Sequence, residues 1–374
     1  MFFTYTLIII LFIYFLSLLV YIIGNFQNNH SSTTNHLESV SVIVAVKNGE
    51  SSLINLLTDL QNQDYNGDIE YIIVDDQSID NTKKIITTFI KQNNSFKYVS
   101  SIEGNPKLFF KKRALDAGIK KARFNILLFT DVDCRLQKTW VSSMAKLFNK
   151  NVDYVIGLSK IDYANNLITW FQKIDLKMLF YVGRGMCNLG IPFACIGQNQ
   201  AYKKSLYDEI GFLDISDSIQ GDDTLFLQLC AKKNKKVVFN DNPISFVNSR
   251  IENNLWPFIK QRIRWAADLK IMWNYNKILF LISLSTFLIN SIIILLILDC
   301  LFFEINDNLK ILYSILMIKL ILEIILYIIG GIKLKLNINP IGFMYWFILE
   351  IPYVVFMGIG SFFIKFIGWR GQKK

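Results

Sequence analysis

Long apolar runs at both ends of the chain restrict its fold more than any other feature. Residues 7–23 carry no charged side chain and are long enough to cross a bilayer once. Residues 278–303 and 309–332 form two further runs of this kind. A mean hydropathy of +0.33 over 374 residues agrees with several spanning helices. We therefore expect an integral, multi-pass membrane protein whose N-terminal helix, residues 1–24, is an uncleaved anchor.

The last apolar stretch, residues 341–367, can be interpreted in two ways because Glu350 and Pro352 interrupt it. A simple crossing would place the basic end, residues 368–374, outside the cell, against the tendency of basic segments to stay inside. A re-entrant pair of half-helices keeps that end in the cytoplasm, and we favour this arrangement over a full span. The C-terminal membrane region then covers residues 276–374.

Composition excludes several classes of function. The net charge is +10, but the Lys and Arg residues are scattered, so anionic lipid and phosphorylated substrates explain the charge better than nucleic acid. The five Cys residues form no CxxC pair, which argues against a zinc site or a disulfide framework. Both His residues lie in a polar linker, residues 25–38, so any general base in the soluble part is expected to be a carboxylate.

The segment 39–275 alternates short apolar runs with helical patterns, which predicts an α/β fold with a mostly parallel sheet. No GxGxxG sequence follows any of the runs, so a dinucleotide-dependent oxidoreductase is excluded. Ligands of such sheets bind at the carboxyl ends of the strands. The expected strands are 41–46, 69–74, 97–100 and 125–129, and the expected helices are 51–60, 80–91 and 111–122.

Carboxylates follow two of these strands. Asp75 and Asp76 come after the second strand, where they can accept hydrogen bonds from a base or a ribose, although turn formation is the simpler interpretation. Asp131 and Asp133 come after another apolar strand, and alternate residues there share a face. Their hard oxygens suit Mg²⁺ or Mn²⁺, which binds diphosphates.

Two further motifs complete the candidate site. Asp222 and Asp223 precede a helical pattern, so they are either a helix cap or a general base. The pentapeptide 261–265 (QRIRW) stands just before an apolar span. Its Arg264 suits phosphate oxygens and its Trp265 suits a sugar ring, while anchoring at the bilayer surface is the alternative interpretation.

In order and spacing, these motifs resemble membrane-embedded family 2 glycosyltransferases. The matching segments cover roughly residues 39–270 and include the DxD and QxxRW motifs of that family. They are SVIVAVKNGE (41–50), VDDQSIDNT (74–82), KKRALDAGI (111–119), TDVDC (130–134), GQNQAYKKSLYDEIGFLD (197–214), GDDTLF (221–226) and QRIRW (261–265).

The resemblance implies a GT-A fold, a nucleotide-sugar donor and inverting transfer of a hexosyl or N-acetylhexosaminyl group. Asp223 would be the catalytic base, and a UDP-sugar is the expected donor. Asp222 stands where the family usually has Glu. The implied donor-binding residues are Asp75, Asp76, Lys112, Asp131, Asp133, Gln261 and Arg264; Asp131 and Asp133 would also hold Mg²⁺ or Mn²⁺, and Trp265 and Asp222 would bind the acceptor.

The acceptor distinguishes several possible functions. We expect a lipid or lipid-linked acceptor at the membrane surface, as in ceramide glucosyltransferases, because three spans seem too few for a polymer channel in a monomer. The alternative is a processive polysaccharide synthase, which could act as a homo-oligomer. A polyprenyl-phosphate glycosyltransferase or an inactive nucleotide-sugar-binding subunit fits less well. The expected location is the inner or plasma membrane, with the catalytic domain in the cytoplasm.

Overall fold

The computed structural model describes residues 2–27, 38–216, 218, 221–303 and 306–366. Most of the predicted linker 25–38 and all of the basic end 368–374 lie outside the described residues. The chain divides into two compact units. We call residues 28–162 and 186–250 the sheet unit, and residues 1–27, 163–185 and 251–374 the helical unit. The sheet unit ends at residue 250, whereas the predicted catalytic domain runs to residue 275.

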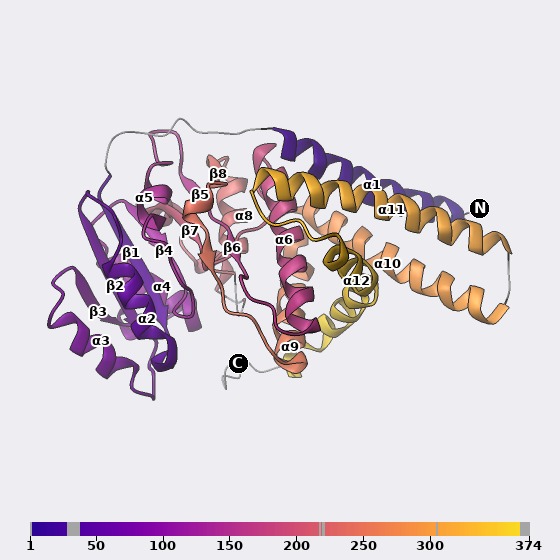
Figure 1. Ribbon diagram of the computed structural model, residues 1–374. Helices are drawn as coiled ribbons and strands as arrows, with labels where there is room; N and C mark the ends of the chain where they lie inside the picture. Colours follow the sequence, from indigo (N-terminus) through magenta and orange to yellow (C-terminus); the bar gives the residue numbers. More distant parts are fainter. Residues whose placement is uncertain (1, 28–37, 217, 219–220, 304–305, 367–374) are drawn as a thin grey trace. The chain divides into compact units, whose positions relative to one another are not determined.

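The described part of the sheet unit contains a seven-stranded, mostly parallel sheet in the order β3-β2-β1-β4-β7-β5-β8 (Figure 1). β7 is antiparallel to β4 and β5, while the other neighbours are parallel. This arrangement confirms the predicted fold class. The strands are β1 (Val40–Val46), β2 (Ile69–Asp75), β3 (Phe96–Ser100), β4 (Ile126–Phe129), β5 (Tyr154–Ile156), β7 (Gln200–Lys203) and β8 (Val237–Phe239), with a separate pair β6 (Ser159–Lys160) and β9 (Val247–Asn248).

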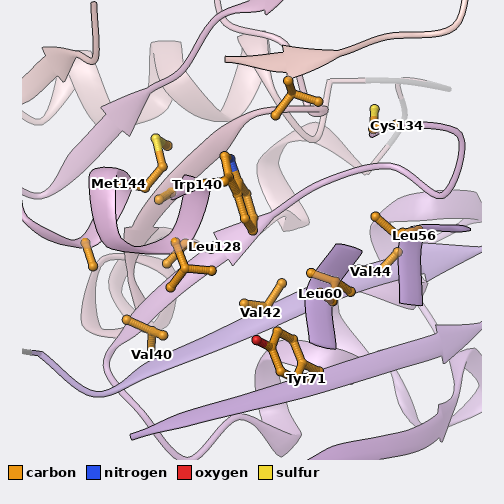
Figure 2. Close-up of a cluster of buried hydrophobic side chains, with 14 of the residues drawn as sticks. Val40, Val42, Val44, Leu56, Leu60, Tyr71, Leu128, Cys134, Trp140 and Met144 are labelled. Atoms are coloured by element: carbon orange, nitrogen blue, oxygen red, sulfur yellow. The ribbon is translucent and has the colours of Figure 1, made fainter. Parts of the chain in front are cut away.

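Helices of the sheet unit cover both faces of β1. Its residues 40, 42, 44 and 46 are fully buried in one hydrophobic cluster, as the period of two in a strand requires (Figure 2). Leu53, Leu56, Leu57 and Leu60 of α2 (Glu50–Gln61) join that cluster, at the i, i+3, i+4, i+7 spacing of one helix face. Helix α4 (Phe110–Lys121) contacts β1 and β2, and its Gly118 permits this because a Cβ there would lie 2.6 Å from Ile43 Cγ2.

The strand order reverses between β1 and β4. The chain passes from β1 to β2 and β3 on one side, and then returns to β4 on the other side of β1. In an open α/β sheet this is the position where ligands bind, outside the carboxyl ends of the strands. The remaining helices of the sheet unit are α3 (Thr82–Ile90), η1 (Ser101–Glu103), α5 (Trp140–Ala145), α7 (Lys204–Ile210), η2 (Leu213–Ile215), α8 (Thr224–Lys232) and η3 (Pro243–Ser245).

The helical unit has four described helices that are long and apolar enough to cross a membrane, which indicates an integral membrane protein. They are α1 (Phe2–Phe26), α10 (Lys277–Phe303), α11 (Asn306–Lys333) and α12 (Pro340–Gly360). The unit also contains α9 (Leu255–Ile271), η4 (Met272–Asn274), η5 (Ser361–Phe366) and the part of α6 (Leu167–Asn188) that ends at Gly185. α1 packs against α10 and α11, and α10 packs against α12. α12 continues as one helix through Pro352, and the choice between a full span and a re-entrant segment for residues 341–367 stays a prediction.

Helices α1 and α6 approach each other closely through two glycines. A Cβ on Gly24 would lie 2.1 Å from the carbonyl oxygen of Gly185, so only glycine fits there. The Asn25 amide donates to the Tyr181 carbonyl oxygen at 2.8 Å, and Arg184 donates to the Asn25 carbonyl oxygen at 2.9 Å. These contacts fix the C-terminal end of α1 on α6.

Candidate functional site

The carboxyl ends of β1 and β2 hold Asp75 and Asp76 in place. The β1–β2 register pairs Val46 with Asp75, and the Asp76 amide donates to the Val46 carbonyl oxygen at 2.7 Å. Asp75 is buried, and its carboxylate accepts hydrogen bonds from the Ser78 amide at 3.1 Å and the Tyr98 hydroxyl at 3.2 Å. Asp75 therefore has the turn-forming role that competes with its predicted role in binding the donor.

Asp76 has a different environment from Asp75. The Lys47 ammonium lies 3.8 Å from its carboxylate and donates to its carbonyl oxygen at 3.1 Å. Asp76 is partly exposed at the edge of the sheet where ligands of this fold bind. Of the two neighbours, Asp76 is thus the better placed to accept hydrogen bonds from a nucleotide.

The loops at this edge of the sheet contain strained backbone. Asn48, Gln77 and Phe110 have positive φ angles of 50°, 55° and 54°, which residues with a side chain rarely adopt. Asn48 follows β1, Gln77 follows β2, and Phe110 is the first residue of α4. Such strain is concentrated at functional sites when the surrounding structure enforces it.

Lys111 joins the carboxylates that follow β4 to those that precede α8. Its ammonium lies 2.8 Å from Asp131 Oδ1 and 3.1 Å from Asp222 Oδ2. Burial lowers the pKa of Lys111, but the charges of Asp131 and Asp222 outweigh it and hold that pKa well above its ordinary value. Lys111 belongs to the basic start of the predicted helix 111–122, where it could meet phosphates, but it was not one of the predicted site residues.

Lys112, which was predicted to bind the donor, points to a different partner. Its side chain is buried, and its ammonium donates to the Ile215 carbonyl oxygen at 2.7 Å and the Ser218 hydroxyl at 3.0 Å, as well as to the Ser218 carbonyl oxygen. Neighbouring residues on a helix diverge by about 100°, so Lys111 and Lys112 serve different sites. In this structure Lys112 fixes backbone shortly before Asp222, and its contact with the donor stays a prediction.

Asp223 is held by two backbone amides. Its Oδ1 accepts from the Thr224 amide at 2.6 Å, which makes it the N-cap of α8, and its Oδ2 accepts from the Gly197 amide at 3.1 Å. Asp223 therefore caps the helix, as one of the two interpretations of the sequence predicted. Each carboxylate oxygen still keeps a further lone pair, and the residue is partly exposed. Burial and the nearby charge of Asp222 raise the pKa of Asp223 to about 6, although Lys111 acts in the opposite direction.

Gly197 lets the backbone come close to this cluster of charged side chains. A Cβ at that position would lie 2.9 Å from the Lys111 ammonium and 3.3 Å from Asp222 Oδ2. The turn that contains Gly197 is fixed on α8, because the Thr224 hydroxyl donates to the Cys195 carbonyl oxygen at 3.1 Å. Backbone thus approaches three charged groups at once without a side chain in the way.

The charges of this cluster suit a divalent cation. Lys111 contributes one positive charge, while Asp131, Asp222 and Asp223 contribute up to three negative charges, so the ionised cluster has an excess of two negative charges. Among the described residues no three His, Cys, Asp or Glu side chains form a complete metal site. Mg²⁺ commonly binds through one or two carboxylates plus substrate phosphates, and the oxygens of Asp131 and Asp133 fit that description.

The QRIRW segment lies on α9 of the helical unit. Arg262, which is not one of the predicted site residues, is buried and makes close contacts within the helical unit. Its guanidinium lies 4.1 Å from the centre of the Trp265 ring, and 3.3 Å from Asp175 Oδ2 on α6. Arg262 and Asp175 are both buried, so the pair holds the indole in one orientation. The roles of Gln261, Arg264 and Trp265 in binding substrate stay predictions.

Comparisons with known proteins agree with this reading of the sheet unit. Residues 41–211 match the family described as Glycosyl transferase family 2. The poly-beta-1,6-N-acetyl-D-glucosamine synthase of Staphylococcus epidermidis is 26% identical over 233 residues, which are 62% of this chain and 54% of that protein. The GalNAc(5)-diNAcBac-PP-undecaprenol beta-1,3-glucosyltransferase of Campylobacter jejuni is 28% identical over 147 residues, which are 38% of this chain and 44% of that protein. The chain spans about half the length of the curated relatives it matches.

One solved structure is similar over nearly the whole chain. It is the mannosyltransferase PcManGT of Pyrobaculum calidifontis, solved in complex with GDP-Man and Mn²⁺. The match covers 96% of this chain and 98% of that chain, with a TM-score of 0.67 and 14% sequence identity. At that identity the likeness concerns the fold. Slightly less than half of the chain, residues 41–211, thus matches glycosyl transferase family 2, and the mostly parallel seven-stranded sheet together with the similar solved structure shows the GT-A fold.

Proposed function

We propose that this protein transfers a sugar from a nucleotide-sugar donor to a hydroxyl group of a lipid or lipid-linked acceptor, with inversion at the anomeric carbon. The observation that carries this proposal is the geometry of Asp223. Two backbone amides hold its carboxylate, and burial together with the charge of Asp222 raises its pKa to about 6. A base of that kind can accept the proton of an attacking hydroxyl.

The reaction is a single displacement. The acceptor oxygen forms a bond to the anomeric carbon, the bond from that carbon to the diphosphate breaks, and the hydroxyl proton passes to Asp223. Asp76 would bind the nucleotide, while Gln261 and Arg264 keep their predicted role in binding the diphosphate. When bound by Asp131 and Asp133, Mg²⁺ or Mn²⁺ would supply positive charge to the diphosphate.

Two observations support a lipid-borne acceptor. Four described helices are suited to a membrane, and the Campylobacter jejuni relative carries an undecaprenol-linked glycan in its name. The second candidate is a polysaccharide synthase, which the name of the Staphylococcus epidermidis relative favours. We place the catalytic domain in the cytoplasm, because Lys333 and Lys335 form a basic loop between two spans.

A donor panel tests the proposal. Membranes that contain the protein are incubated with radiolabelled UDP- and GDP-sugars and either Mg²⁺ or Mn²⁺, and the product is divided into lipid-extractable and polymeric fractions. We expect label in the lipid fraction, and no label with Asp223→Asn. Label in a polymer would favour the synthase, and absence of transfer from every donor would refute the activity.

A further inference from the structure

A group of polar side chains lies among the four apolar helices of the helical unit. Lys319 and Asn290 are fully buried, and Glu323 and Glu350 are 4% and 5% exposed. Such residues are rare in membrane spans, and where they occur they usually have a function. The group takes one or more members from each helix: Tyr14 from α1, Asn290 from α10, Lys319 and Glu323 from α11, and Glu350 from α12.

Hydrogen bonds connect all four helices through this group. The Lys319 ammonium donates to Glu323 Oε1 at 2.7 Å and to Glu350 Oε2 at 2.8 Å. The Tyr14 hydroxyl donates to Glu323 Oε1 at 2.5 Å, and the Asn290 amide donates to Glu350 Oε1 at 3.3 Å. Lys319 thus bridges two carboxylates.

The formal charges of the group do not balance. Lys319 contributes one positive charge and the two carboxylates contribute two negative charges, which leaves one negative charge in excess. Asp175 and Arg262, which are also buried in the helical unit, form a pair of their own at 3.3 Å. An unbalanced charge away from water is costly, and proteins usually avoid it by neutralising the group.

The hydrogen bonds show where the imbalance lies. Both oxygens of Glu350 have donors, whereas both donors to Glu323 reach its Oε1. Among the described residues, Glu323 Oε2 and Asn290 Oδ1 are buried acceptor oxygens without a hydrogen-bond partner. The site therefore lacks one positive charge, and a proton on Glu323 Oε2 would supply that charge and turn one of the two unpaired acceptors into a donor.

We propose that the helical unit binds one proton at Glu323 Oε2, so that Glu323 is a neutral carboxylic acid beside the Lys319–Glu350 ion pair. The other titratable groups near the site are Tyr14 on α1 and Tyr353 on α12, together with Asp175 on α6 and Arg262 on α9. This inference does not depend on the proposed transfer reaction.

The proton makes the stability of the helical unit depend on pH. At neutral pH the folded protein would hold a proton that an exposed carboxylate, with a pKa of about 4.3, has already released, so the folded state binds more protons than the unfolded state. Stability then falls as pH rises, by about tenfold in the unfolding equilibrium constant per pH unit while one proton separates the two states. Glutamine is the neutral isostere of a protonated Glu, so Glu323→Gln should remove this dependence.

Infrared spectroscopy of the purified full chain in detergent provides the direct test. We expect a carboxylic-acid carbonyl band at neutral pH, which disappears in Glu323→Gln and persists in Glu350→Gln. Thermal unfolding followed by circular dichroism should show the alkaline loss of stability in the wild type and not in Glu323→Gln. Asp307→Asn is the matched control, because Asp307 is an exposed carboxylate of the same helix, and it should change neither result.

Three results would overturn the proposal. A spectrum without the acid band would mean that both carboxylates are ionised. Loss of the band in Glu350→Gln alone would place the proton elsewhere. Restoration of alkaline stability by Na⁺ or K⁺ in the wild type would show that the site takes an alkali-metal ion.

Discussion

Replacement of Asp223 by Asn separates the catalytic role of this residue from its structural one. Asn is as good an N-cap as Asp, so the bond from the Thr224 amide can survive in the variant. The amide group of Asn cannot accept at both ends, so the bond from the Gly197 amide is lost, which costs about 1–3 kcal/mol of stability. We expect a folded protein with slightly reduced stability.

The effect on turnover should be much larger than the effect on stability. Loss of a general base lowers kcat by roughly 10²–10⁴. The wild-type rate should also fall below pH 6, because protonated Asp223 cannot accept a proton, and at pH 5 about a tenfold loss follows from its pKa of about 6. The variant should lose this acidic limb together with its rate.

The assay measures steady-state rates over about three to four pH units around that pKa. Nucleotide binding measured by calorimetry checks that the donor site is intact. Asp208→Asn, an exposed carboxylate on α7, is the control and should behave as the wild type. A variant that keeps more than about a tenth of the wild-type rate, with the acidic limb in place, would refute the assignment of the base.

The remaining predictions concern two residues that position others. Gly197→Ala should fold but lose most activity, because its Cβ would lie 2.9 Å from the Lys111 ammonium; normal rates in a transfer assay would contradict this. Arg262→Lys should keep the charge pair with Asp175 but lose the planar contact with Trp265, which raises the KM for acceptor more than it lowers kcat. Arg262→Leu should lower the free energy of unfolding by about 3–5 kcal/mol, because Asp175 is left buried without its cationic partner. Equal thermal stability of Arg262→Leu and Arg262→Lys would contradict this prediction.

Local patterns made much of the fold predictable. The second strand was expected at 69–74 and is found at Ile69–Asp75, because an apolar run bounded by turn residues reports a buried strand directly. Lys319 and Glu323 likewise stand at the i,i+4 spacing that brings two side chains together on one helix face, and they pair at 2.7 Å. Local spacing determines such contacts, so no tertiary knowledge is needed.

The sequence patterns did not predict which distant segments contact each other. Glu350 seemed only to interrupt an apolar stretch, but it pairs with Lys319, 31 residues away. In the same way, the choice between Lys111 and Lys112 depends on the rotation of one helix about its axis. A difference of one residue decides which ammonium reaches Asp131, and the pattern of charges alone does not fix that rotation.

The hydrogen bond between Tyr14 and Glu323 has a consequence for synthesis of the chain. Its two residues are 309 positions apart, so at a synthesis rate of 5–20 residues per second α1 waits roughly 15–60 s for this partner. Asn25 at the other end of α1 meets Tyr181 after only 156 positions. The first helix is therefore secured in two stages: α6 contacts its C-terminal end first, and α11 contacts it only after the whole sheet unit has been synthesised.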